Sequence, residues 1–290
     1  MPVANLCGIA ALLIWSATAV LIVGTGAMPP FLLGTVTFFI GFLATFSIEK
    51  LRGSDFKRLR GLSARVYLFG FFGVGVHTLF LYYGFKNAPP FAANTLNYVW
   101  PILLAVFVAV MEKRKLRIEN YAGLLLGFAG AVLLFSGRGS ASADYSLWGY
   151  FSAFMAGLVW AIYSAAARRV AYPAMATGVF FLMTAILSLA AHLLFEETVW
   201  PDNAGWIMAV ALGIGRIAYT MWDYAMKQGD QEFLASLSYF VPLLSTLVLI
   251  FFGFVPSSPA TLLAGVMIIS GCLAANIRKI LPLCGKLRKK

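Results

Sequence analysis

The sequence predicts an all-α integral membrane protein with ten transmembrane helices, which form two inverted five-helix repeats. Three observations carry this prediction: the apolar composition, ten apolar segments of spanning length, and basic residues in alternate connections. Of the 290 residues, 61% are hydrophobic and 11% are charged, whereas about 25% of an average soluble domain is charged. This composition excludes intrinsic disorder, and it provides too few polar side chains to cover a soluble globule.

Ten segments contain the run of about 20 apolar residues that crosses a bilayer as a helix. None shows the short alternating pattern of β-barrel strands. The first has no basic residue before its apolar core, so we expect a retained helix and not a cleaved signal peptide. The predicted spans are residues 4–24, 30–48, 66–86, 90–111, 119–136, 147–168, 175–195, 205–227, 233–253 and 259–277.

The basic residues predict an orientation for these spans. If the N-terminus lies in the cytoplasm, all 22 lysine and arginine residues except Lys86, Arg138 and Arg216 fall on the cytoplasmic side. Arg216 lies within a span, so only the other two oppose the positive-inside rule. We therefore expect both termini in the cytoplasm, with the basic tail near anionic lipid headgroups and no nucleic-acid partner. On the outer side, Glu196 and Asp202 predict a solvated acidic turn.

The two halves of the chain share a motif near the centre of one helix each. Residues 95–101 (TLNYVWP) and 236–242 (SLSYFVP) both read Ser/Thr-Leu-Asn/Ser-Tyr-x-x-Pro. Because a repeat of five helices has an odd number of spans, the second half starts on the opposite side of the membrane, as in many secondary transporters. We expect a first repeat in residues 1–136, a connecting loop in 137–146, a second repeat in 147–277 and a basic cytoplasmic tail in 278–290.

The repeat, the cytoplasmic termini, a tryptophan in the first helix of each half (Trp15, Trp160) and a mid-helix proline together resemble the drug/metabolite transporter superfamily. The stretch 94–101 (NTLNYVWP) is similar to that of the YddG-type aromatic amino acid exporters. The resemblance covers residues 1 to about 277. It implies a ten-helix bundle with a central cavity, which exports aromatic amino acids or related small metabolites across the bacterial inner membrane. The first, third, fourth, sixth, eighth and ninth helices are expected to line the cavity.

Ionisable residues deep in a span are costly, and they are candidates for function by default. Arg216, Asp223 and Lys227 recur on one face of the eighth helix. They either bind the carboxylate and amine of a substrate or form an internal network that fixes helix packing. His77 lies on a glycine-rich face, so it is either a cavity residue or a histidine at a close helix contact. We expect His192, near the outer end of its span, to be structural.

Polar and aromatic residues at mid-span complete the predicted site. Each repeat motif places a tyrosine beside a proline, which frees a carbonyl one turn earlier and allows a hinge. Mid-span rings suit flat aromatic solutes. The candidate substrate-binding residues are Trp15, His77, Tyr82, Asn94, Tyr98, Trp160, Tyr163, Tyr219, Asp223 and Tyr239, and the candidate hinge residues are Pro101 and Pro242.

Two other functions are compatible with the sequence. The same fold can carry cationic drugs, nucleosides or sugar phosphates, since aromatic cavities also bind cations. A polytopic membrane enzyme or receptor would need a clustered catalytic set, and the sequence shows neither paired deep carboxylates nor a His-Asp pair. It has no phosphate-binding Walker motif, and its scattered cysteines predict no metal or other cofactor. The expected partners are a small-molecule substrate and membrane lipids; the oligomeric state is not predicted, and a monomer is compatible.

Overall fold

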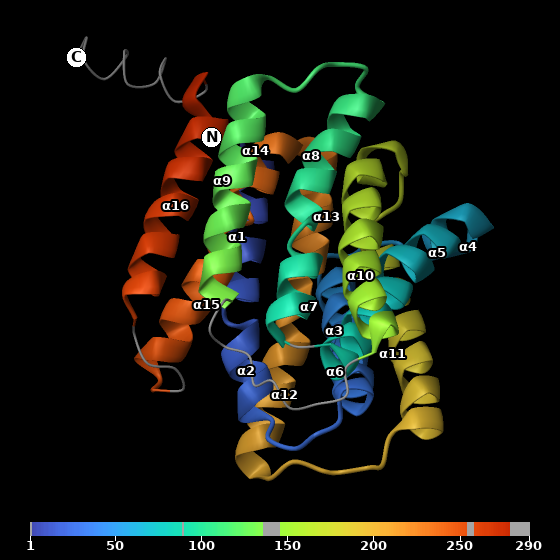
Figure 1. Ribbon diagram of the computed structural model, residues 1–290. Coiled ribbons are helices and arrows are strands. Elements are labelled where there is room, and N and C mark those ends of the chain that lie inside the picture. The colour runs from blue at the N-terminus through green and yellow to red at the C-terminus, as the bar shows by residue number, and fades with distance from the viewer. Residues whose placement is uncertain (1, 89, 136–145, 254–257, 279–290) are drawn as a thin grey trace.

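The computed structural model describes residues 2–88, 90–135, 146–253 and 258–278 as a bundle of helices, and these ranges contain no strand (Figure 1). The beginning of α1 and the end of α16 lie at the same end of the bundle. The helical elements are α1 (Val3–Ser16), α2 (Thr18–Gly24), α3 (Pro30–Leu51), α4 (Lys57–Arg60), α5 (Ala64–Gly70), η1 (Phe71–Val76), α6 (His77–Asn87), α7 (Pro90–Asn97), α8 (Trp100–Met111), α9 (Ile118–Phe135), α10 (Leu147–Ala166), η2 (Ala167–Arg169), α11 (Met175–Phe195), α12 (Asn203–Gly215), α13 (Ile217–Gln228), α14 (Gln231–Leu237), α15 (Phe240–Phe251) and α16 (Pro259–Ala275).

Eight helical segments of the described chain are long and apolar enough to cross a bilayer. The predicted spans 119–136 and 259–277 correspond to two shorter apolar helices, Ile118–Leu133 and Pro259–Ala275. The prediction of an all-α membrane protein is therefore confirmed. The eight segments are Val3–Gly24, Pro30–Leu51, Ala64–Phe85, Ala92–Met111, Leu147–Arg169, Met175–Phe195, Asn203–Gln228 and Gln231–Phe251.

Several long spans change helical geometry near their middle. A π-helical stretch, η1, lies in the third span directly before His77, and single π-helical turns inside α-helices often occur at functional sites. Non-helical backbone at membrane depth is tolerated where protein or a polar cavity surrounds it. The other breaks in the described chain fall at Ala17, at residues 98–99, at Arg216 and at residues 238–239.

The two prolines of the repeat motif explain two of these breaks. Pro101 and Pro242 lie in the first turns of α8 and α15, where a missing backbone N–H is tolerated. The chain is therefore interrupted two to four residues before each proline, between α7 and α8 and between α14 and α15. The sequence predicts one kinked helix at each place, whereas the structure has two helices joined by a short turn.

Long antiparallel contacts hold the bundle together: α3 packs along α11, α6 along α10, α9 along α16, and α1 along α13. Glycines allow several of these approaches. A Cβ atom at Gly73 would lie 2.0 Å from the Tyr163 ring, and one at Gly84 would lie 2.8 Å from the Ala153 backbone. The glycine-rich face that carries His77 is thus the surface on which α10 packs.

The prediction of a solvated acidic turn is wrong for Glu196, whose side chain is 1% exposed. Its carboxylate accepts hydrogen bonds from the backbone N–H groups of Phe31 and Leu32, at 3.1 and 3.2 Å, and lies 3.0 Å from Nδ1 of His192. The first N–H groups of α3 have no partner within the helix, so a carboxylate is favourable there. Glu196 and His192 thereby tie the end of α11 to the beginning of α3. Asp202 caps α12 at Gly205.

The contact between α9 and α16 provides a test of packing. A Cβ atom at Gly123 would lie 2.4 Å from the backbone nitrogen of Ala275, whereas one at Gly265 would meet the Leu243 side chain at an ordinary 3.5 Å. We expect Gly123→Ala to destabilise the protein by about 1–3 kcal/mol, because backbone must move. Thermal unfolding in detergent measures this change. Gly265→Ala is the control: it should leave the transition temperature unchanged or raise it, and equal losses from both variants would contradict the packing.

Candidate functional site

Five aromatic residues from four helices meet near the middle of the bundle. We call Trp15, Trp100, Trp160, Tyr219 and Trp222 the aromatic cluster. Ring centroids of Trp15 lie 5.7 Å from Trp160, 5.6 Å from Tyr219 and 5.3 Å from Trp222. Trp100 lies 6.5 Å from Trp160 and 5.8 Å from Trp222, both edge-to-face. Such spacings are the range in which aromatic rings attract one another. Three predicted site residues, Trp15, Trp160 and Tyr219, are therefore brought together.

Trp222 is one of the mid-span rings that favour a binding cavity in the sequence, but neither Trp222 nor Trp100 is among the candidate substrate-binding residues. Trp222 is completely buried, and its Nε1 donates a hydrogen bond to Ser164 Oγ at 3.0 Å. It follows Tyr219 by three residues, so both rings lie on one face of α13. That three-residue spacing is the signal in the sequence that could have added Trp222 to the candidate substrate-binding residues. Trp100 directly precedes Pro101, and its position at the beginning of α8 aims it at the same cluster.

His77 joins the edge of the aromatic cluster. Its ring lies 5.1 Å from that of Trp160, and its Nδ1 lies 2.9 Å from the carbonyl oxygen of Ala156. Tyr163, one turn after Trp160, stacks on it at 5.4 Å. The structure therefore combines the two roles that the sequence left for His77. It lies at a close helix contact, and it also touches a residue of the cluster.

Asp223 is engaged within the protein. Its Oδ2 lies 2.7 Å from Nζ of Lys227, and its Oδ1 accepts a 2.6 Å hydrogen bond from the Tyr172 hydroxyl. The Tyr172 ring also lies 3.2 Å from the Lys227 ammonium, and its hydroxyl contacts Tyr163 at 3.2 Å. Burial raises the pKa of Tyr172 well above its ordinary value, so this hydroxyl stays protonated. The arrangement matches the internal network that the sequence allowed for Asp223.

The remaining candidates lie on different sides of the site. The Tyr82 hydroxyl lies 3.3 Å from the Arg216 guanidinium. Asn94 and Tyr98 are half-buried at the end of α7 and at the break that follows it. Tyr239 is 2% exposed and packs toward α9, where its ring lies 6.5 Å from Phe128. No ring contact joins Tyr239 to the aromatic cluster in the described part of the chain.

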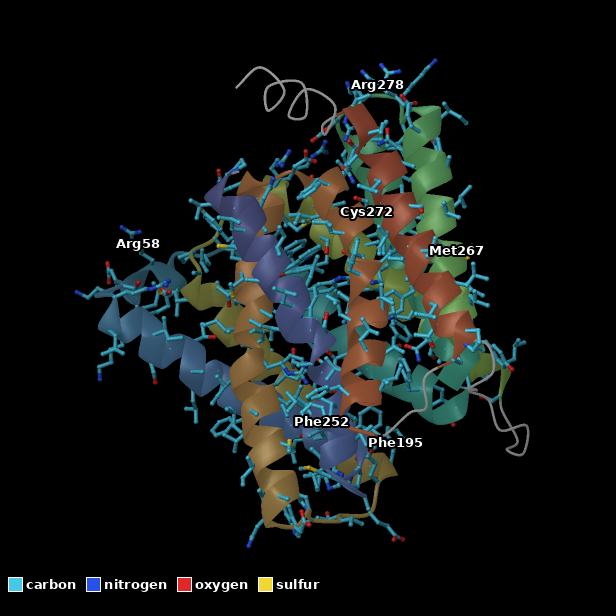
Figure 2. The ribbon with its side chains drawn as sticks, turned by 90° about the vertical axis from the view of Figure 1, so that its left-hand side faces the viewer. Arg58, Phe195, Phe252, Met267, Cys272 and Arg278 are labelled. Carbon is cyan, nitrogen blue, oxygen red and sulfur yellow. The ribbon has the colours of Figure 1, made fainter. Side chains whose placement is uncertain are left out.

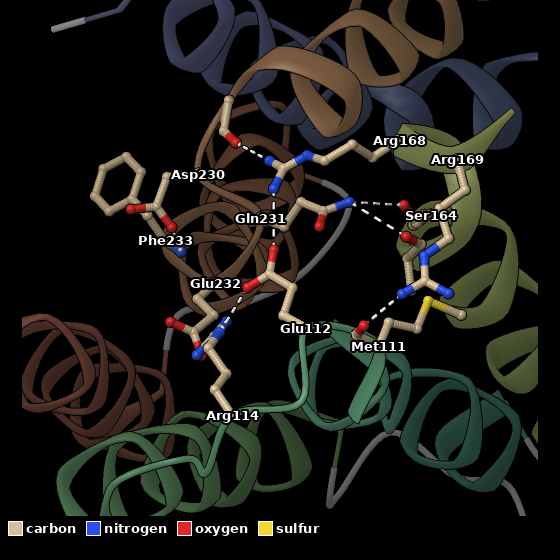
Figure 3. A network of polar contacts seen from close by, with 12 residues as sticks. Met111, Glu112, Arg114, Ser164, Arg168, Arg169, Asp230, Gln231, Glu232 and Phe233 are labelled. Carbon is tan, nitrogen blue, oxygen red and sulfur yellow. Dashed lines mark hydrogen bonds and ion pairs between the residues drawn. The ribbon is translucent and has the colours of Figure 1, made fainter. Parts of the chain in front are cut away.

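Ion pairs and hydrogen bonds close one end of the bundle (Figure 3). Glu112, after α8, accepts hydrogen bonds from Arg114 at 2.6 Å and from Arg168 at 3.0 Å. Arg114 also pairs with Glu232 of α14, and Arg169 donates to a backbone carbonyl at the end of α8. We call this end, which carries Arg114, Arg168 and Arg169, the basic end. The network joins α8 to helices from the second half of the chain.

Arg278 lies at one end of the bundle, and Phe195 and Phe252 lie toward the other (Figure 2).

Two cavities lie away from the aromatic cluster. An apolar recess of about 580 Å³ lies among α3, α6, α10 and α11 and is lined by residues such as Phe80, Tyr83 and Trp148. A polar cavity of about 260 Å³ lies in the network at the basic end, beside Glu112 and Arg168. Within the described residues, no group of three or more histidine, cysteine, aspartate or glutamate side chains could hold a metal ion.

An aromatic cluster among apolar helices that are interrupted at mid-span is an arrangement typical of multi-pass membrane transporters. The sequence comparison assigns the particular family: the chain belongs to the EamA-like transporter family, whose profile matches residues 2–136 and 147–277.

The chain is similar to several proteins named aromatic amino acid exporter YddG. That of Ancylobacter novellus is 39% identical over 279 residues, which cover 94% of this chain and 97% of that protein. That of Salmonella typhimurium is 25% identical over 257 residues, covering 84% and 86%. A protein of known crystal structure, 38% identical in sequence, aligns with a TM-score of 0.88 over 95% of this chain and 98% of the other. This similarity confirms the resemblance seen in the sequence.

Proposed function

We propose that this protein exports aromatic amino acids or related small metabolites by alternating access. The aromatic cluster carries the proposal: its rings lie at mid-span, where four helices meet, and three of those helices, α1, α8 and α13, lie directly beside a break in their spans. Faces and edges of indole and phenol rings attract a flat aromatic side chain at such spacings. The names of the relatives from Ancylobacter novellus and Salmonella typhimurium support this substrate class.

The test is uptake of labelled phenylalanine and tryptophan into proteoliposomes that contain the purified protein. We expect uptake well above that of empty liposomes, and we expect unlabelled aromatic amino acids to compete. Transport no faster than into empty liposomes, with an active carrier measured in parallel, would contradict the proposal. Stronger competition by a cationic drug, a nucleoside or a sugar phosphate would favour the alternative cargo.

The proposed architecture is ten transmembrane helices in two inverted repeats, residues 1–136 and 147–277. The family profile matches the chain twice over nearly the same ranges. The breaks before Pro101 and Pro242 also fall at equivalent positions of the two repeats. Discontinuous helices at the interface of inverted repeats are typical of secondary transporters. We propose that the two halves rock about these breaks.

We further propose that the protein lies in the bacterial inner membrane with both termini in the cytoplasm. The distribution of basic residues supports this orientation. In a cysteine-free background, a cysteine introduced at Ser140, in the loop 137–146, should react with an impermeant thiol reagent added outside intact cells. A cysteine at Lys57 should react only after the membrane is opened. The reverse pattern would contradict the orientation.

The network at the basic end must separate if the carrier opens on that side. Glu112 accepts hydrogen bonds from Arg114 and Arg168, so Glu112→Gln weakens the contact of Arg168 with the end of α8 while the pair between Arg114 and Glu232 remains. Exposed ion pairs contribute up to about 1 kcal/mol each. We therefore expect the population open at the basic end to rise about fivefold, which corresponds to about 1 kcal/mol. The readout is the labelling rate of a cysteine at Leu104, which is completely buried on α8.

Arg52→Gln is the matched control for this variant. Arg52, the residue directly after α3, pairs with Glu49 of the same helix at 3.3 Å, so its loss separates no helices. The labelling rate at position 104 in Arg52→Gln should stay within about twofold of the parent, because the Arg52 side chain is 70% exposed and joins no second helix. Equal labelling rates in Glu112→Gln and Arg52→Gln would show that the network does not hold the basic end closed.

A further inference from the structure

Arg216 lies in the middle of the span Asn203–Gln228, at the break between α12 and α13. Its side chain is buried, with 8% of the residue exposed. Nη2 donates hydrogen bonds to Thr37 Oγ1 at 2.9 Å and to the Tyr82 hydroxyl at 3.3 Å. The guanidinium carbon lies 4.0 Å from the centre of the Phe38 ring. Two neutral oxygens and an aromatic face therefore surround a full positive charge at membrane depth.

Arg216 contacts no aspartate or glutamate in the described ranges of the chain. Its Nε is buried and has no acceptor within hydrogen-bond distance there. A buried charge without a counter-ion is costly, and such a residue in a span points to function. Lys227, in the same span, is paired with Asp223 at 2.7 Å. Lys227 therefore already has an anionic partner. Arg216 has none in the described chain, and its unpaired Nε–H could donate a hydrogen bond to a bound anion.

The guanidinium adjoins the aromatic cluster. Its carbon lies 5.9 Å from the ring centre of Tyr219, which in turn lies 5.6 Å from Trp15 and 5.4 Å from Trp160. A molecule whose ring packs among these side chains can place a carboxylate at Arg216 within the length of one amino acid. Guanidinium and carboxylate groups match in geometry, because both are planar and can form paired hydrogen bonds.

The side of the site that would receive an ammonium group lacks a corresponding anion. Both oxygens of Asp223 have partners, Tyr172 and Lys227, and the residue is 4% exposed. The other buried carboxylates of the described chain lie toward span ends: Glu49 pairs with Arg52, and Glu196 holds the beginning of α3. The aromatic cluster therefore adjoins a cation that can bind a carboxylate but, within the described residues, no available anion that could bind an ammonium group.

We infer that Arg216 binds the substrate carboxylate and that the ligand class is aromatic monocarboxylates, with or without an α-amino group. This inference rests on the proposed function and extends it. Aromatic acids that lack the amine are ligands of the same site. Aromatic amines that lack the carboxylate are excluded, because their charge would lie beside an arginine that nothing neutralises.

Competition for labelled L-phenylalanine, bound to the wild-type protein in lipid nanodiscs, tests this inference. We expect 3-phenylpropionate to compete within about tenfold of phenylalanine, whereas phenethylamine and phenylalanine methyl ester are at least about 30-fold weaker, the factor expected for hydrogen bonds to a charged group. Equal competition by phenethylamine and 3-phenylpropionate would overturn the inference and leave the proposed function in place. Direct binding of labelled 3-phenylpropionate decides the case in which phenylalanine does not bind: binding of the acid supports the inference, and its absence overturns both proposals.

Two variants locate the effect at Arg216. Arg216→Gln should weaken binding of phenylalanine and of 3-phenylpropionate by about 30-fold or more, and Arg216→Lys should restore part of the loss. Binding of phenethylamine should not fall. Unchanged affinity for both acids in Arg216→Gln would overturn the inference. Since the wild-type competition needs no variant, the inference remains testable if Arg216→Gln does not fold.

Discussion

Replacing Trp160 with alanine is expected to reduce phenylalanine and tryptophan transport by about 100-fold, which corresponds to a loss of about 3 kcal/mol of binding free energy. The indole of Trp160 lies within 5.7 Å of Trp15 and Tyr219 and 5.1 Å from His77. It also stacks on Tyr163, so the Trp160 ring connects the aromatic cluster to both His77 and Tyr163. Its removal deletes a binding surface and loosens the neighbouring rings. Initial uptake rates in proteoliposomes measure the effect.

Trp206→Ala is the matched control. Trp206 is a tryptophan of the same protein, stacked on Trp200 at 5.8 Å near the beginning of α12 and far along the span from Arg216. We expect its transport rate to stay within about twofold of the wild type, because rings at span ends serve mainly as interfacial anchors. Trp160→Phe should recover part of the lost rate. Equal losses in Trp160→Ala and Trp206→Ala, with both proteins monodisperse, would show that the aromatic cluster is not the binding site.

The second large effect concerns the stability of the pair between Asp223 and Lys227. Lys227→Met should destabilise the protein by about 3 kcal/mol, because breaking a buried ion pair leaves the other charge without a partner. The Asp223 side chain is 5% exposed and that of Lys227 is 16% exposed. The double variant Asp223→Asn, Lys227→Met should recover more than half of this loss. Thermal unfolding in detergent, with the wild type alongside, gives the comparison.

Glu119→Gln provides the control for an exposed pair. Glu119 lies 2.6 Å from Arg278, whose side chain is 64% exposed, so water screens the attraction. Its loss should change the unfolding free energy by at most about 1 kcal/mol. If Lys227→Met were as harmless as Glu119→Gln, or if the double variant lost as much as the sum of the single ones, the pair would not act as a buried network.

Much of the class and fold follows from the sequence, since hydropathy is a local property of each segment. Apolar runs predicted the helices, and the motif ending at Pro101 indicated the family. The same reasoning placed Glu196 in water, because it lies in a charged connection between two apolar spans. It could not detect the unpaired N–H groups of α3 that lie 164 and 165 residues away along the chain. Packing between distant segments therefore decided the environment of that carboxylate.

The candidate site divides in the same way. The sequence by itself determined which residues are unusual at mid-span, including Trp160, Arg216 and Asp223, because polar or aromatic character at membrane depth can be recognised from position alone. Only the tertiary structure decided that Asp223 has a partner in Lys227 while Arg216 has no acidic partner in the described chain. The difference has a physical reason: a charge is satisfied or unsatisfied according to the atoms that surround it, and here those atoms come from helices far apart in the sequence.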